Sequence, residues 1–292
     1  MNVAARLTAF AVALMVLFAG ATAVGRAVDP VHDEVAGAMG DHGEGHGDGG
    51  TGGHAGTTPA AAGGLAVTDG DLRLDLERTV LSAVEAQPLR FRILDGGGEA
   101  VTDFDPEQGG VELHLVVVGR DLSGFQHLHP DMAADGTWSI PLALGSPGAH
   151  RAIVDVTVGG QPHTLGVDLF APGEVTPQPL PAPAGTARAD GYQVTFDDPG
   201  LAAGAGARLA FSVSRDGAPV GDLQPYLDAA GHLVALRQGD LAYLHLHPQD
   251  EPDGATIEFE GAFPSPGLYR LFLQFRHEGS VHTVPFTVEV SR

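Results

Sequence analysis

An internal repeat constrains this chain more than any other feature of its sequence. The block HLVVVGRDLSGFQHLHP, which starts at His114, aligns without a gap with HLVALRQGDLAYLHLHP, which starts at His232. A second block, SPGAHRAIVDVTVGGQPHT from Ser146, aligns with SPGLYRLFLQFRHEGSVHT from Ser265. Any fold adopted by one half must therefore be adopted again by the other, and 292 residues suffice for two domains of ordinary size.

The segments 268–275 and 281–290 have the pattern of β-strands with one buried side. Every second residue along them is apolar, which is the period of a strand that packs one face on a core. These apolar residues are Tyr269, Leu271, Leu273 and Phe275 in the first segment and Val284, Phe286, Val288 and Val290 in the second. The 42 glycines and 21 prolines favour frequent turns over packed helices. The sequence therefore predicts an all-β chain with two tandem β-sandwiches.

Shifts in composition divide the chain into five expected segments. After Arg6, the apolar run LTAFAVALMVLFAGATAV has the form of an export signal, which is either cleaved or kept as a membrane anchor. The Gly-, Asp- and His-rich stretch that follows has too few apolar residues to fold, and a Pro-rich stretch predicts a semi-rigid linker. The segments are a hydrophobic helix that is a signal peptide or membrane anchor (1–28), a disordered His-rich tether (29–64), a first β-domain (65–170), a Pro-rich linker (171–187) and a second β-domain (188–292). We expect the domains to work outside the cytoplasm, either secreted or anchored to the membrane.

Net charge and cysteine content limit the partners of the chain. The formal charge of −22 repels nucleic acid and anionic membrane surfaces, so neither is an expected partner, and it attracts cations. The chain has no cysteine, which excludes disulfides, thiolate metal sites and cysteine nucleophiles. Any metal ion must therefore be bound by nitrogen and oxygen atoms.

Four histidines occur at matching positions of the two repeats. His127 and His129 flank one leucine, and a strand places residues at this spacing on the same face. If the preceding strand turns back at 119–122, His114 lies opposite His127 on that face, and each domain carries a histidine trio. The candidate metal ligands are His114, His127, His129 and His163 in the first domain and His232, His245, His247 and His282 in the second. Of these, His163 and His282 are candidate fourth ligands.

The histidine trios suit a divalent metal ion. Neutral imidazole binds zinc(II) or copper(II) at about 2 Å, and three converging rings leave a fourth position for another ligand or water. The chain has four methionines, two of them in the export segment, which provides little thioether for copper(I). We expect copper(II) or zinc(II), buffered or delivered to a membrane metal transporter. In the tether, His32, His42, His46 and His54 either bind metal loosely or are incidental to a solvated linker.

Two other functions fit the same residues. In the first, the histidines are structural groups that stabilise the β-sandwich through hydrogen bonds. The chain is then a secreted, non-enzymatic interaction module. Alternatively, GDLAYLHLHPQDE (239–251) matches the first metal-binding motif of the cupins, which would make the chain a metalloenzyme. The first repeat lacks the glycine and the glutamate of that motif, and the second cupin motif is absent from GAFPSPGLYRLFLQF. No Ser-His-Asp set, phosphate loop or carboxylate pair stands out in the sequence, so we expect no enzyme.

The sequence also resembles a known family of proteins. The blocks ELHLVVVGRDLSGFQHLHP and GHLVALRQGDLAYLHLHP, followed by PGLYRLFLQF and HTVPFTVEV, resemble exported, largely uncharacterised actinobacterial proteins with tandem immunoglobulin-like β-domains. Some of these proteins are associated with heavy-metal handling. The resemblance covers most of 90–292. It implies an immunoglobulin-like fold for both domains, and it implies that His114, His127, His129 and their counterparts in the second domain are motif positions.

Overall fold

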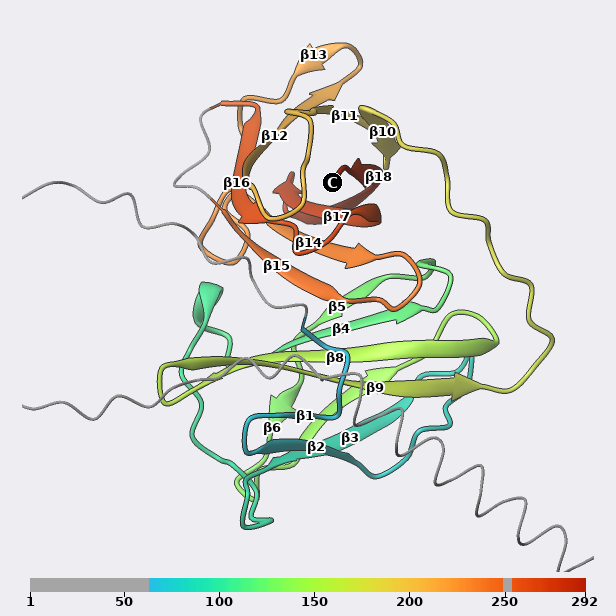
Figure 1. Ribbon diagram of the computed structural model, residues 1–292, viewed down its shortest axis with the longest axis vertical. Coiled ribbons are helices and arrows are strands. Elements are labelled where there is room, and N and C mark those ends of the chain that lie inside the picture. Colours follow the sequence, from blue (N-terminus) through green and yellow to red (C-terminus); the bar gives the residue numbers. More distant parts are fainter. Residues whose placement is uncertain (1–62, 249–253) are drawn as a thin grey trace, which may run out of the picture. The chain divides into compact units, whose positions relative to one another are not determined.

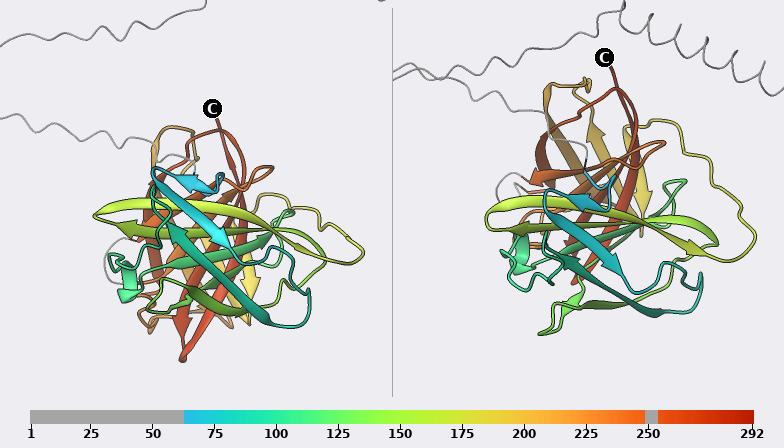
Figure 2. Two further views of the ribbon diagram at one scale, coloured as in Figure 1. Left: turned by 90° about the horizontal axis from the view of Figure 1, so that it is seen from below. Right: turned by 60° about the horizontal axis from the view of Figure 1, so that its bottom comes forward.

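The structure is a computed structural model, and it describes residues 63–248 and 254–292. Apart from one short 3-10 helix, this part of the chain consists of strands, turns and loops (Figures 1 and 2). The elements are β1 (Thr68–Asp69), β2 (Leu72–Leu76), β3 (Gln87–Leu94), the 3-10 helix η1 (Gln108–Gly110), β4 (His114–Gly119), β5 (Gln126–Leu128), β6 (Asp131–Met132), β7 (Trp138–Leu142), β8 (Gly148–Val158), β9 (Gln161–Ala171), β10 (Thr186–Ala189), β11 (Tyr192–Asp197), β12 (Gly206–Arg215), β13 (Ala218–Pro219), β14 (His232–Arg237), β15 (Tyr243–Pro248), β16 (Thr256–Ala262), β17 (Gly267–His277) and β18 (Ser280–Val290). The prediction of an all-β fold is confirmed. The expected N-terminal helix and nearly all of the tether lie outside the described residues. Among the residues described, no helix is long and apolar enough to cross a membrane.

The first domain, β1 to β9, is a sandwich of two sheets. One sheet has the order β1-β2-β3-β7-β6 and the other β5-β4-β8-β9. On β3, Leu89, Phe91 and Ile93 alternate with exposed residues and are almost fully buried. Leu115 and Val117 of β4 belong to the same apolar cluster. The sheets therefore pack through the alternating apolar side of each strand, as in a sandwich.

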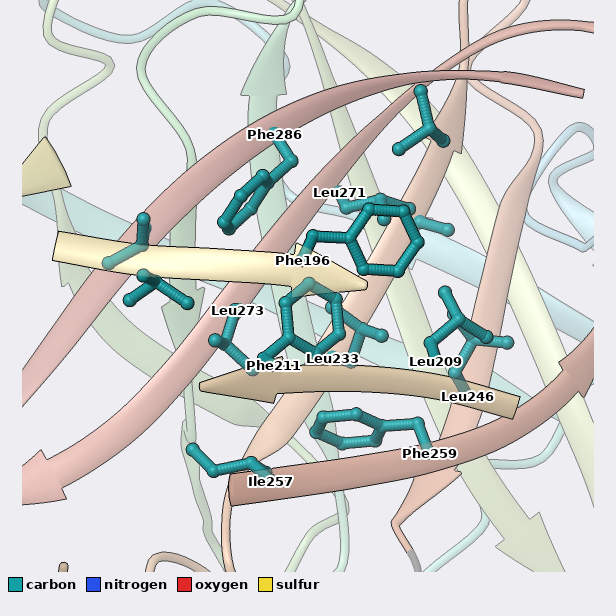
Figure 3. Packing of buried hydrophobic residues seen from close by; sticks show 14 of the residues in the cluster. Phe196, Leu209, Phe211, Leu233, Leu246, Ile257, Phe259, Leu271, Leu273 and Phe286 are labelled. Atoms are coloured by element: carbon teal, nitrogen blue, oxygen red, sulfur yellow. The ribbon is translucent and has the colours of Figure 1, made fainter. Parts of the chain in front are cut away.

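The second domain, β10 to β18, repeats this arrangement with one difference. Here β15 pairs with both β14 and β16, which joins the two layers into one continuous sheet of order β10-β11-β12-β16-β15-β14-β17-β18, with β13 on β12. The apolar stripes predicted for 268–275 and 281–290 are confirmed, because every residue named for them is at most 4% exposed. Phe196, Phe211, Phe259 and Phe286 lie together in this core (Figure 3).

The internal repeat reappears in the strand register. Val116 of β4 lies opposite His127 of β5, and Val234 of β14 lies opposite His245 of β15. The paired residues of the second domain follow those of the first by 118 positions, which is the offset of the sequence alignment. The two copies therefore fold with the same backbone pairing around their histidine strands.

The two domains pack against each other through the outer side of these strands. The described residues of both domains belong to one compact unit of the chain, Ala55–Arg292. Phe125 and Phe272 stack with their ring centroids 4.0 Å apart and their planes 9° apart. We call this contact the interdomain face; its buried apolar residues are Val116, Val118, Leu122 and Ile153 of the first domain and Val234, Leu236, Leu241, Tyr243 and Phe272 of the second. Because both sides of β4 are covered, all six of its residues are buried, and its sequence reads as a continuous apolar run rather than an alternating one.

The start of the described chain runs along both domains. Gly63 exchanges two backbone hydrogen bonds with Tyr243 of the second domain, and the amide of Gly64 donates to the carbonyl of Thr164 in the first. A Cβ atom on Gly166 would come within 2.0 Å of the Gly64 carbonyl oxygen, so only glycine permits this approach. The segment at 63–64 therefore connects β9 with β15.

Candidate functional site

Three histidines of the first domain meet on the interdomain face. His114 Nδ1 lies 2.8 Å from His127 Nε2 and 3.2 Å from His129 Nε2. One ring nitrogen from each residue lies within 4.8 Å of the other two. The sequence predicted His114 directly opposite His127. The register instead places Val116 opposite His127, and the two histidines still share a face because His114 and Val116 are two residues apart. The structure thus brings His114, His127 and His129 together, and we call these three residues the trio.

A tight turn positions β5 for this contact. The carboxylate of Asp121 accepts hydrogen bonds from the amide and the hydroxyl of Ser123, at 3.1 and 2.6 Å. Leu122 and Gly124 both adopt left-handed backbone conformations, with φ of 65° and 62°. This turn reverses the chain immediately after β4, so that His127 and His129 lie beside His114 rather than farther along the sheet.

A hydrogen bond from the second domain sets the tautomer of His127. Its Nδ1 lies 2.7 Å from Oε1 of Gln274, and the amide nitrogen of Gln274 donates to the hydroxyl of Thr283 at 3.2 Å. Because the amide oxygen can only accept, Nδ1 of His127 carries the proton. The lone pair of His127 is then on Nε2, which points to the trio.

A carboxylate lies beside the outer nitrogen of His114. Glu107 Oε2 is 3.4 Å from His114 Nε2, where it would stabilise a proton on that nitrogen once Nδ1 binds a cation. His114 Nδ1 lies 2.8 Å from His127 Nε2, and with the proton of His127 on Nδ1 the His127 Nε2 lone pair accepts a hydrogen bond from His114. A cation bound by both nitrogens would replace the proton between them. Nitrogens bound to one tetrahedral zinc ion at 2.0–2.1 Å lie roughly 3.3 Å apart, close to the spacing in the trio.

The third ligand candidate, His129, is held in the neutral state that metal binding requires. Burial lowers the pKa of the His129 imidazole, because desolvation disfavours the charged ring. Metal ligation requires the neutral ring. Partial burial therefore keeps His129 available as a ligand near neutral pH.

Two carboxylates supply negative charge beside the trio. Asp155 of β8 lies opposite His114 and is 6% exposed, and it accepts hydrogen bonds from Thr164 at 2.9 Å and from Tyr243 at 3.1 Å. Burial raises the pKa of the Tyr243 hydroxyl well above its ordinary value, and the charges of Asp155 and Glu107 add to this rise. Two carboxylates next to neutral imidazoles match the charge of a divalent cation.

The second domain contributes a histidine to the same place. The ring of His232 stacks on that of His127, with centroids 4.5 Å apart, and on that of His114, with centroids 5.3 Å apart; both pairs of planes differ by 18°. The sequence predicted one cluster per domain, with His232 in the second. The structure places His232 against the first trio, because the matching faces of both domains pack together. The backbone of His245 pairs with Val234, and the side chains of His245 and His247 lie outside what the structure describes.

The proposed fourth ligands lie elsewhere. His163 of β9 opposes Val156, a residue of the first core, so it is on the opposite side of the sheet from the trio; its Nδ1 lies 3.7 Å from Asp69. His282 of β18 opposes Phe275, a residue of the second core, and its Nδ1 lies 3.1 Å from Asp190. The structure places neither residue beside His114, His127 and His129, and a sheet separates His163 from that trio. The role of both residues as fourth ligands stays a prediction.

Sequence reasoning missed the polar residues that surround the trio. Asp155 and Gln274 stand at matching positions of the repeat, each inside an apolar strand, AIVDVTV and LFLQF. A polar residue within a buried strand is a signal that was available. Glu107 comes from the loop that leads into η1, and no local pattern marks it. The Glu251 of the cupin-like motif lies outside the described residues.

The solved structures that are similar to this chain share little sequence with it. No curated protein matches this chain. Similar solved structures include the Escherichia coli adhesin FdeC, with 15% identity over 78% of this chain and 66% of that one (TM-score 0.25), and invasin, a bacterial integrin-binding protein, with 14% identity over 74% and 39% (TM-score 0.21). Domains 4 and 5 of the S-layer protein SbsC are 14% identical over 78% of this chain and all of theirs (TM-score 0.23). This chain therefore spans less than two thirds of the length of FdeC and of invasin.

The family model described as Domain of unknown function (DUF8832) matches twice, at residues 66–172 and 187–292. The fold is that of two tandem immunoglobulin-like β-sandwiches, one for each match. The two matches together cover most of the chain, and the protein belongs to the DUF8832 family.

Proposed function

We propose that this chain is a non-enzymatic, extracytoplasmic protein that binds a divalent metal ion, copper(II) or zinc(II), through His114, His127 and His129. The observation that carries this proposal is the convergence of three ring nitrogens within 4.8 Å of one another. Gln274 and Glu107 support it, because Gln274 directs the Nε2 lone pair of His127 into the trio, and Glu107 would stabilise a proton on the outer nitrogen of His114 once a cation binds.

The rest of the chain suits an exported metal carrier. The charge of −22 attracts cations, and the apolar segment at 7–24 has the form of an export signal or membrane anchor. A protein with these features would buffer metal ions outside the cytoplasm or deliver them to a membrane transporter. Nitrogen ligands suit copper(II) first and zinc(II) next in intrinsic affinity.

The position of the trio favours a second candidate function. The trio lies on the interdomain face, beside apolar residues of both domains, and His127 bonds to Gln274 across it. Histidines in this position can stabilise the packing of the two domains without any metal, as in a secreted interaction module. A measurement of metal binding distinguishes the metal-binding protein from the interaction module.

Loading the chain with metal tests the proposal. The full chain is purified without a histidine tag, stripped with a chelator and titrated with zinc or copper, and its thermal unfolding is followed. An ion that binds only the folded state stabilises it by about 2.7 kcal/mol at roughly 100 times its Kd, so the unfolding midpoint should rise by several degrees. Metal bound by the tether should leave the midpoint unchanged.

A matched variant removes the contribution of the tether. Replacing His32, His42, His46 and His54 with alanine should leave the stabilisation intact. If neither metal shifts the midpoint of either protein, the interaction module is the better assignment.

A further inference from the structure

We infer that both domains build the metal centre: Gln274 of the second domain positions a ligand of the first, and His232 of the second domain covers it. Metal binding and the docking of the two domains are therefore one coupled equilibrium. This inference rests on the metal-binding function proposed above and assigns it a mode of control.

Gln274 is the positioning residue. It is 5% exposed and lies on β17, and its amide oxygen holds Nδ1 of His127 at 2.7 Å. The hydroxyl of Thr283 fixes the orientation of that amide. A hydrogen bond to the outer nitrogen of a ligating histidine sets both its tautomer and the plane of its ring. In the undocked first domain this acceptor is absent, and the Nε2 lone pair of His127 is no longer directed at the trio.

His232 covers the trio from the side of the second domain. It is fully buried, and it lies opposite Gln274 in the pairing of β14 with β17. Its ring is parallel, within 18°, to the rings of His114 and His127. His232 therefore restricts the ring planes of the trio and excludes water from it.

Other contacts across the interdomain face hold this arrangement. The hydroxyl of Tyr243 in the second domain donates to Asp155 in the first at 3.1 Å. Phe125 stacks on Phe272 with centroids 4.0 Å apart. Undocking would break these contacts, expose the apolar residues and remove the outer shell of the trio in one step. A ligand that binds the docked state more tightly shifts the chain toward docking, and weaker docking lowers the affinity for that ligand by the same factor.

The first test changes Gln274 in the full-length chain. Gln274→Leu removes the acceptor for His127 and should weaken zinc binding about 10–100-fold, the usual effect of losing an outer-shell partner. Gln274→Glu keeps an acceptor at the same point and should bind zinc nearly as the parent chain does. Zinc affinity is measured by competition with a chromophoric chelator. Equal affinities for the leucine variant and the parent chain would overturn the inference.

The second test weakens docking without touching the trio. Phe272→Ala removes the stack with Phe125 and should lower zinc affinity by a factor within the usual range of allosteric coupling, about 5–150-fold. Phe170→Ala is the matched control, because Phe170 is an exposed phenylalanine of β9 that lies outside the interdomain cluster, and its affinity should equal that of the parent chain. If Phe272→Ala does not fold, as judged by circular dichroism, Phe125→Ala removes the same stack from the other side.

The outcomes separate this inference from the proposed function. If the parent chain binds neither zinc nor copper, the proposed function itself fails. If the parent chain binds metal, and both Gln274→Leu and the variant that loses the stack bind it equally well, the metal centre belongs to the first domain alone and only the coupling is wrong.

Discussion

Replacing His127 with alanine should weaken zinc binding more than about 100-fold, beyond the effect of losing an outer-shell partner. The substitution removes a ring nitrogen that lies 2.8 Å from His114 Nδ1. It also removes the group through which Gln274 of the second domain acts on the trio. The two nitrogens that remain cannot form a three-nitrogen site, and water must replace the missing ligand.

His150 provides the matched control for this loss. It is a buried histidine of β8 in the same domain, and it contacts Ser146 and the carbonyl of Gly148 rather than the trio. His150→Ala should therefore leave zinc affinity unchanged. Affinity is measured by chelator competition near neutral pH, and the number of bound ions by elemental analysis. Equal losses from His127→Ala and His150→Ala would show that stability, and not ligation, determines binding.

Replacing Phe211 with alanine should destabilise the second domain by about 3–5 kcal/mol, the usual cost of removing a buried aromatic ring. Phe211 is 0% exposed, and its ring centroid lies 5.0 Å from that of Phe196, 5.4 Å from Phe286 and 6.0 Å from Phe259 (Figure 3). These rings come from different strands of the sheet that surrounds the core. The remaining side chains cannot close the cavity without losing contacts with one another.

Two signals together distinguish an effect on the second domain from an effect on the first. The only tryptophan of the chain, Trp138, is buried in the first core, so its fluorescence follows the first domain, whereas circular dichroism follows both. In urea, the dichroism transition of Phe211→Ala should move to lower denaturant. Val281→Ala, at an exposed site on β18, should change stability by less than about 0.5 kcal/mol. A small effect of Phe211→Ala would mean that the core can collapse around the missing ring.

The features that the sequence predicted correctly depend on local periodicity and on the repeat. The alternation of Leu271 and Leu273 with other residues sufficed to place them in a core, because a strand has a period of two. The HxH spacing placed His127 and His129 on one face, and His114 lies on the strand before the hairpin turn. These two features were enough to predict that the three rings lie close together. The predicted register differs from the observed one by two residues, which leaves His114 on the same face as His127. A difference of one residue would have placed His114 on the other face of the sheet.

The features that could not be predicted from the sequence depend on how whole sheets pack against each other. The strand β4 is covered on both sides, so its apolar residues do not alternate. Burial along β9 is mixed, and its sequence has no pattern that predicts the side of the sheet on which His163 lies. The contact of His232 with the trio depends on the docking of two domains. Glu107 reaches His114 from a loop, where side-chain positions do not follow a strand period.

The interdomain face has the character of a symmetric homodimer contact within a single polypeptide. Equivalent positions of the two repeats occupy it, such as Val116 with Val234 and Phe125 with Tyr243. Two separate copies of one domain would form such an isologous contact about a two-fold axis, and dilution would dissociate them. Covalent linkage makes the encounter intramolecular and sets a fixed effective concentration. At concentrations where two separate copies would dissociate, the two halves of this chain therefore stay paired.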